Sequence, residues 1–267
     1  MPISKNDTPI ALSISGHDPT GGAGVIADAE VFTQFGCHPC TILTCQTVQD
    51  SSTVHRLISL SGNNLIEQAN ILFNDMPIAA IKIGLTGSVE CVEAIVNVVL
   101  KHPNIPVVFD PILASGDGTA LASEKLIRTI ADTLLPLVDV LTPNTLEAVK
   151  LCSLSTNSSI DSLGKTLLKQ GAKNVLITGG HEHGEQIINH LFQANAASQQ
   201  YSWIRLHGEY HGTGCTLASA IAALIAKGES IPSAVEQAQT YTDQAIRHAR
   251  KIGKGQAFPS RGHIDTK

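Results

Sequence analysis

The sequence predicts an α/β fold in three layers, with helices on both faces of a mostly parallel central sheet. Two observations carry this prediction. Short apolar runs of strand length alternate with longer segments of helical periodicity, as in chains built from βα units. The chain also has 267 residues, 43% of them hydrophobic and 15% charged, which suffices for one large core.

Six runs are the expected strands of the parallel sheet, because continuously apolar runs are typical of strands buried on both faces. They cover residues 10–15, 41–47, 79–83, 106–110, 138–141 and 174–178. Helices are expected between them where apolar residues share one face at three- and four-residue spacing. These faces are formed by Leu65, Ile66, Ala69, Leu72 and Phe73, by Leu126, Ile127, Ile130 and Leu134, and by Leu217, Ala220, Ile221, Leu224 and Ile225.

The later part of the chain adds two features to this α/β pattern. Residues 186–192 and 201–206 predict a small antiparallel hairpin beside the parallel sheet, with the polar residues 193–200 as its loop. From residue 253 the chain becomes rich in Gly and Lys and loses its apolar periodicity. We therefore expect residues 1–252 to form a single domain and residues 253–267 to form a flexible tail.

Composition narrows the classes of function. The formal net charge is -5 and the basic residues are scattered, so we expect no nucleic-acid partner. No apolar run approaches the roughly 20 residues that span a bilayer, so we expect no membrane association and a cytoplasmic location. The six cysteines should then be reduced. Cys37 and Cys40 leave a redox pair open, although they precede a strand instead of opening a helix.

A glycine-containing turn at residues 211–216, His-Gly-Thr-Gly-Cys-Thr, leads directly into an apolar helix. Its free N–H groups and the positive end of the helix dipole favour an anion such as phosphate. A helix cap without a ligand is the alternative. A second glycine cluster follows the first strand, but it lacks the GxGxxG spacing of a dinucleotide site. Ser159 stands where a Walker A loop ending at residues 164–166 would need glycine.

Seven segments in order resemble the hydroxymethylpyrimidine/phosphomethylpyrimidine kinases of the ribokinase-like superfamily. They are SGHDPTGGAGVIAD (15–28), TVQD (47–50), KIGL (82–85), DPILASGDG (110–118), LTPNTLEA (141–148), ITGGH (177–181) and HGTGCTLASAIAA (211–223). The resemblance implies a ribokinase-like α/β/α sandwich. It also implies ATP-dependent phosphorylation, in thiamine biosynthesis, of 4-amino-5-hydroxymethyl-2-methylpyrimidine and then of its monophosphate.

Carried over by position, the resemblance implies residues that hold the pyrimidine. Gly16, Asp28 and Gln49 would hold the aminopyrimidine, and a carboxylate and a carboxamide can pair with its amino group and ring nitrogen. Leu85 would cover the ring.

The resemblance also implies a nucleotide side. Glu147 would help to hold Mg²⁺ through water, with a helix cap as the alternative reading. The implied phosphate site consists of Gly212, Thr213, Gly214 and Asp110, and the implied ATP-binding residues are Asn144, Thr178, Gly180 and His181. His181 and His183 form a His-x-His pair that we interpret as loop residues near the nucleotide, not as metal ligands.

Cys215 stands where sugar kinases of the superfamily carry a catalytic aspartate. A thiol at a helix N-terminus can ionise near neutral pH, so Cys215 is the predicted general base, with a buried, inert thiol as the alternative. The chain departs from the family at Thr178, where lysine is common, at Asn189, where aspartate is usual, and in a short stretch after Asp110 that lacks a lysine. Magnesium, backbone N–H groups or another cation must then neutralise the leaving group.

Two rival functions remain open at this point. A pyridoxal or pyridoxine kinase belongs to the same branch and carries this cysteine. A binding or regulatory protein that has lost phosphoryl transfer would explain the missing lysines. The expected partners are a small pyrimidine and ATP, and we expect a homodimer.

Overall fold

The computed structural model describes residues 8–116, 118–180, 182, 184–194 and 196–262. Within these residues, nine strands form one sheet in the order β3-β2-β1-β4-β5-β6-β7-β8-β9. Neighbouring strands from β2 to β7 are parallel, whereas β3, β8 and β9 are antiparallel to their neighbours. The strands are β1 (Ile10–His17), β2 (His38–Gln49), β3 (Val54–Ser59), β4 (Ile78–Ile83), β5 (Val107–Phe109), β6 (Val140–Leu141), β7 (Asn174–Ile177), β8 (Gln186–Gln193) and β9 (Gln199–Ile204).

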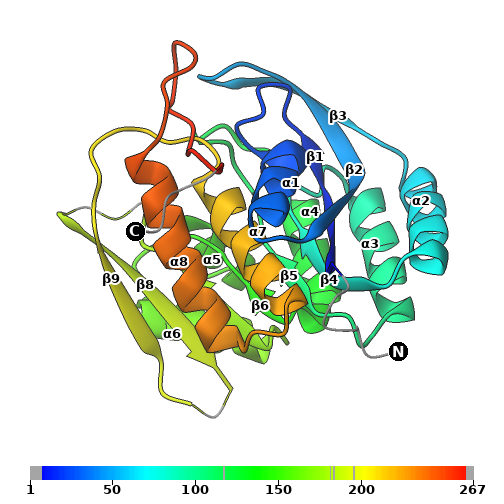
Figure 1. Ribbon diagram of the computed structural model, residues 1–267. Coiled ribbons are helices and arrows are strands. Elements are labelled where there is room, and N and C mark those ends of the chain that lie inside the picture. The colour runs from blue at the N-terminus through cyan, green and yellow to red at the C-terminus, as the bar shows by residue number, and fades with distance from the viewer. Residues whose placement is uncertain (1–7, 117, 181, 183, 195, 263–267) are drawn as a thin grey trace.

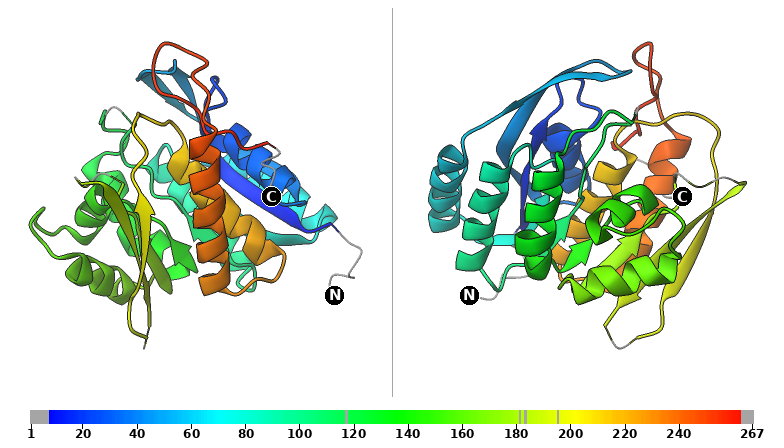
Figure 2. Two further views of the ribbon diagram at one scale, coloured as in Figure 1. Left: turned by 60° about the vertical axis from the view of Figure 1, so that its left-hand side comes forward. Right: turned by 180° about the vertical axis from the view of Figure 1, so that it is seen from behind.

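Helices cover both faces of the sheet, as Figures 1 and 2 show. One apolar core forms under α1 (Gly24–Gln34), α7 (Thr213–Ala226) and α8 (Ile231–Arg247). A second core fills the other face, under α2 (Gly62–Asp75), α3 (Val89–Lys101), α4 (Glu124–Thr129), α5 (Thr145–Cys152) and α6 (Ile160–Lys169). The predicted three-layer sandwich with a mostly parallel sheet and an antiparallel edge hairpin, β8–β9, is confirmed.

Local sequence explains where several helices begin and end. Ser61, Ser88, Ser123 and Ser159 each accept a hydrogen bond from a first-turn N–H, at the starts of α2, α3, α4 and α6. The apolar face predicted from Leu126 onward is present, but α4 continues as a π-helix (Ile130–Leu134) and a 3-10 turn (Leu135–Leu137). Pro136 cannot donate the N–H that a longer α-helix would require.

Two segments differ from the prediction. Strand β3 carries no apolar alternation because most of its side chains are exposed, so its sequence pattern gives no strand signal. Residues 255–261, expected within a flexible tail, are instead buried or half-buried, and Phe258 and Arg261 are only 8% and 3% exposed. Backbone bridges fasten this segment to the domain, from Ala257 to Tyr210 and from Phe258 to Arg250.

Cys37 and Cys40 belong to the two different cores on opposite faces of the sheet. Burial raises the pKa of both thiols. Side chains that point to opposite faces cannot form a disulfide, so a redox pair does not fit this segment. No helix in the part of the chain that the structure describes is long and apolar enough to cross a membrane.

Candidate active site

A cavity of about 690 Å³ opens where the parallel strands end. Its lining comes from the carboxyl ends of β1 and β2, from the segments after β1, β4, β5, β6, β7 and β9, and from the starts of α5 and α7. Val54, Ile187, Ile246 and Gln256 complete it. This is where loops converge in an open parallel α/β sheet. The predicted site residues that line it are Gly16, Gln49, Leu85, Asp110, Asn144, Glu147, Thr178, Gly180, Gly212, Thr213, Gly214 and Cys215. His181 and His183 lie outside the described residues.

The anion-binding turn has the geometry that its sequence requires. Gly212 is the N-cap of α7 and has a φ of 82°, a conformation that favours glycine. A Cβ atom at this position would also overlap the carbonyl oxygen of Gly22. The first N–H groups of a helix have no partner inside that helix, so those at the start of α7 can meet an anion in the cavity.

Asp110 and Cys215 lie beside this turn. The Oδ2 atom of Asp110 is buried without a hydrogen-bond partner, 3.5 Å from where a Cβ atom of Gly214 would lie. Burial raises the pKa of Asp110 to about 6, although Lys82 and, to a smaller extent, the Cys215 thiol oppose the rise. Burial also raises the pKa of Cys215 to about 12, again against the effect of Lys82. The expectation that this thiol ionises near neutral pH is therefore wrong for the free protein, because burial outweighs the helix dipole.

Asp28 is in the core, not in the cavity, which corrects the prediction that it holds the pyrimidine. Its carboxylate is fully buried and pairs with Lys82, whose Nζ atom lies 2.8 and 2.9 Å from the two oxygens. Ser13 and Ser219 donate further hydrogen bonds to it at 2.5 and 2.7 Å. Burial alone would lower the pKa of Lys82, but Asp28 and other nearby acidic groups raise it. Asp28 thus keeps Lys82 charged, and the charge of Lys82 also acts on Asp110.

Asn144 and Glu147 form a capping box at the start of α5. The Asn144 side chain accepts from the Glu147 N–H and the Glu147 Oε2 atom accepts from the Asn144 N–H, both at 2.9 Å. Glu147 therefore caps the helix, as the alternative to a magnesium role predicted. Its carboxylate still lines the cavity, where burial and the charge of Asp110 raise its pKa to about 8. A cation between these two carboxylates would relieve their repulsion.

Asp18 and His211 are cavity residues to which the sequence reasoning gave no role. His211 Nε2 lies 2.7 Å from Asp18 Oδ2 and 3.2 Å from the side-chain nitrogen of Gln49. Burial opposes ionisation of Asp18, but hydrogen bonds from His211 and Thr20 hold its pKa below the usual value. Asp18 and His211 each belong to one of the seven family-like segments, and a carboxylate and a histidine in two such segments were the available signal.

Arg205 is a further cation at the cavity, at the end of β9. Its guanidinium donates to the carbonyl oxygens of Gly180 and Gly184 at 2.8 Å and of Glu182 at 2.5 Å. These hydrogen bonds hold the loop after β7 in place. The family departures at positions 178 and 189 fall in this region, where Asn189 accepts from the Gly179 N–H at 3.0 Å.

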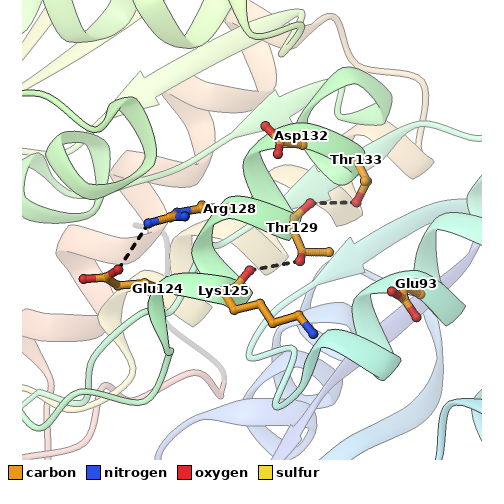
Figure 3. Close-up of a pocket in the computed structure, with 7 residues that line it drawn as sticks. All are labelled: Glu93, Glu124, Lys125, Arg128, Thr129, Asp132 and Thr133. Atoms are coloured by element: carbon orange, nitrogen blue, oxygen red, sulfur yellow. Dashed lines mark hydrogen bonds and ion pairs between the residues drawn. The ribbon is translucent and has the colours of Figure 1, made fainter.

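A separate hollow of about 480 Å³ lies between α3 and α4, as Figure 3 shows. The interactions drawn there run within the α4 segment: Arg128 pairs with Glu124, and two threonines donate to carbonyl oxygens four residues earlier. Its charged side chains belong to solvated helix faces, so the chemistry is assigned to the larger cavity. In the described part of the chain, no three His, Cys, Asp or Glu side chains gather as a metal site.

Known proteins resemble this chain over most of its length. The model of the phosphomethylpyrimidine kinase family matches residues 18–260. A hydroxymethylpyrimidine/phosphomethylpyrimidine kinase of Staphylococcus aureus is 34% identical over 250 residues, which cover 92% of this chain and 91% of that protein. The phosphomethylpyrimidine kinase structure from Clostridium difficile aligns with a TM-score of 0.77 and 31% identity, over 88% of this chain and 98% of that one.

A pyridoxal kinase of Staphylococcus aureus aligns with a higher TM-score, 0.88, at 25% identity. It covers 98% of this chain and 96% of that one. It has been solved with pyridoxal and with AMP-PCP. The fold is thus shared across two kinds of vitamin kinase.

Proposed function

The chain belongs to the phosphomethylpyrimidine kinase family, and on that premise we propose that it transfers the terminal phosphoryl group of ATP to 4-amino-5-hydroxymethyl-2-methylpyrimidine and then to its monophosphate. This is a step of thiamine biosynthesis. One observation carries the proposal: a single cavity joins the helix N-terminus at Gly212 to a buried carboxylate, Asp110, and to a carboxamide, Gln49. Phosphoryl transfer needs an anion site, a proton acceptor and a positioned acceptor alcohol within reach of one another.

Gln49, Gly16 and Leu85 form the proposed pyrimidine end. A Cβ atom at Gly16 would lie 2.9 Å from Cys45 Sγ and 3.2 Å from Leu85 Cδ2, so a larger residue at this position would displace one of these two side chains. Asp28 is withdrawn from this role because it is buried against Lys82. Asp18 and His211 lie beside this end of the cavity, with His211 Nε2 2.7 Å from Asp18 Oδ2 and 3.2 Å from the side-chain nitrogen of Gln49.

The proton of the substrate hydroxyl passes to Asp110 through Cys215 in this proposal. The thiol gives its proton to Asp110 while it takes the proton of the hydroxyl, so no free thiolate is needed. Asp110 ends protonated, and its pKa of about 6 suits a proton acceptor near neutral pH.

The residues fit a magnesium ion on the nucleotide side. The Oδ2 atom of Asp110 is unpartnered, and the repulsion between Asp110 and Glu147 favours a cation near both. Glu147 would hold Mg²⁺ through water, because its two oxygens already accept backbone hydrogen bonds. The ion would neutralise charge on the phosphates during transfer.

Asn144, Thr178 and Gly180 line the proposed nucleotide end, beside Arg205. AMP-PCP is an ATP analogue, and its complex with the similar pyridoxal kinase supports ATP as the phosphoryl donor. Arg205 already uses its guanidinium to fold the loop after β7, and its positive charge substitutes in part for the lysine that relatives carry at position 178.

Pyridoxal is the second candidate substrate, favoured by the TM-score of 0.88 to the pyridoxal kinase. Turnover of hydroxymethylpyrimidine and of pyridoxal should be compared in one assay of ADP formation, with products identified by mass spectrometry. We expect the pyrimidine to give the higher kcat/KM and two successive phosphorylations. Pyrimidine binding without ADP formation would instead establish a regulatory protein.

A homodimer in the cytoplasm completes the proposal. Val48 and Ile58 are 42% and 39% exposed on the same face of the β2–β3 pair, which supports a contact with a second copy. All six cysteines are free and buried, as expected in a reducing compartment. Light scattering of the parent and of a Val48→Lys variant tests the dimer.

A further inference from the structure

The C-terminal segment, residues 255–261, is fastened to the rim of the cavity. The Gln256 N–H donates to the Ser51 carbonyl at 2.8 Å, and the His211 N–H donates to the Ala257 carbonyl at 2.9 Å. Figure 1 shows the loop that follows α8, in red, beside the β2–β3 turn. The Gln256 side chain lines the cavity, 2.9 Å from where a Cβ atom of Gly116 would lie.

Arg261 anchors the end of this segment inside the protein. Its side chain is only 2% exposed. Its Nε atom donates to Thr216 Oγ1 at 2.8 Å, and its two terminal nitrogens donate to the carbonyl oxygens of Gly21, at 3.3 Å, and Gly22. An ion pair of 3.2 Å to Glu30 balances part of its charge. One guanidinium therefore joins the glycine turn after β1 to the first turn of α7.

These contacts place Arg261 directly behind the anion-binding turn. A Cβ atom at Gly212 would lie 2.7 Å from a terminal nitrogen of Arg261. Thr216 Oγ1, which accepts from Arg261, donates to the Gly212 carbonyl at 2.8 Å. The glycine turn continues to Gly24, whose backbone N–H lowers the pKa of the Cys215 thiol against the larger effect of burial. Arg261 thus contacts both backbone segments that hold the turn and the thiol.

We propose that Arg261 is a positioning residue for phosphoryl transfer, which fixes the turn at Gly212 and the Cys215 thiol relative to each other by fastening the C-terminal segment beneath them. The proposal rests on the proposed kinase function. The planar fork of arginine suits this role because it binds four oxygens in different directions at once, those of Thr216, Gly21, Gly22 and Glu30. A lysine would supply the charge but has too few donors, and no rigid fork, to make all four contacts.

The test compares Arg261→Ala, Arg261→Lys and Arg250→Gln with the parent. Arg250 is an exposed residue of the same C-terminal region and serves as the matched control. We expect Arg261→Ala to lower kcat by about 10²-fold, with the KM for the pyrimidine changed by less than about threefold. Guanidinium ion at millimolar concentration should restore part of the lost kcat of Arg261→Ala. Arg261→Lys should remain well below the parent, and Arg250→Gln should match it.

A second readout does not need turnover. The Cys215 thiol should react with iodoacetamide faster in Arg261→Ala than in the parent, as followed by mass spectrometry, while Arg250→Gln shows no change. The proposal is overturned if the kcat of Arg261→Ala stays within about threefold of the parent. It is also overturned if kcat falls but the alkylation rate is unchanged and guanidinium ion restores no activity. If Arg261→Ala does not fold, Arg261→Lys carries both readouts. A parent that forms no ADP refutes the kinase proposal, and the alkylation rate then still decides whether Arg261 positions Cys215.

Discussion

Replacement of Cys215 and Asp110, singly and together, tests the proposed proton relay. At about pH 7.5, a thiol with a pKa of about 12 is ionised in roughly three molecules in 10⁵, which corresponds to a cost of about 6 kcal/mol. A positioned base contributes about 10²- to 10⁴-fold, or roughly 3 to 5.5 kcal/mol. A free thiolate is therefore a costly species at this position, and a thiol that passes its proton on as it receives another avoids that cost.

The relay predicts that Cys215→Ala and Asp110→Asn each lower kcat by about 10²- to 10⁴-fold, with the pyrimidine affinity little changed. Cys215→Ser should retain more activity than Cys215→Ala, because a hydroxyl group can also receive and donate a proton. The double variant should be no slower than the slower single variant, since both changes interrupt one path. Rates of ADP formation at saturating ATP and pyrimidine give these values.

Cys152→Ala is the matched control, because Cys152 is also a buried thiol but lies in the core under α5 and α6. Its kcat should equal that of the parent. If Cys215→Ala turns over within about threefold of the parent while Asp110→Asn does not, Asp110 accepts the proton directly and the relay is wrong. If the two losses multiply in the double variant, the residues act on separate steps.

Three further changes test the rest of the site. Gln49→Ala should raise the KM for the pyrimidine by the equivalent of about 1 to 3 kcal/mol, and an unchanged KM would remove Gln49 from the pyrimidine end. Glu147→Gln should shift the magnesium dependence of turnover to higher concentrations. The folded protein favours the protonated form of Glu147, so its free energy of unfolding should fall as pH rises from about 4.5 to about 8. The free energy of unfolding of Glu147→Gln, measured by urea denaturation, should fall less over the same range. Asp28→Asn should lower the free energy of unfolding by about 3 to 5 kcal/mol because Lys82 is left buried alone, and Asp28→Asn with Lys82→Met should recover much of it.

The architecture could be predicted because its signals are local. Continuous apolar runs marked the parallel strands, and glycines before an apolar helix marked the turn at Gly212. Strand β3 gave no such signal, since its pairing with β2 satisfies the backbone while its side chains stay in solvent. The C-terminal segment was missed for a related reason: its order comes from backbone hydrogen bonds to Ser51 and His211, which composition does not reveal.

The site was harder to predict where a residue's role depends on a distant partner. The carboxylate of Asp28 could bind a ligand, but Lys82, 54 positions later, pairs with it in the core. The start of a helix suggests a reactive thiol at Cys215, whereas the nearby carboxylate of Asp110 and complete burial make that thiol hard to ionise. Both errors concern electrostatics, which depends on three-dimensional proximity more than on sequence position.

The distribution of charge in the cavity also bears on the missing lysines. Lys82 is neutralised by Asp28, which leaves Asp110 and Glu147 as two neighbouring carboxylates, each with a raised pKa. A bare nucleotide would add further negative charge to this region. A metal-bound nucleotide would instead bring the positive charge that both carboxylates favour. A lysine at position 178 would then be less necessary, because the cation that neutralises the phosphates would arrive with the nucleotide and would be favoured by Asp110 and Glu147.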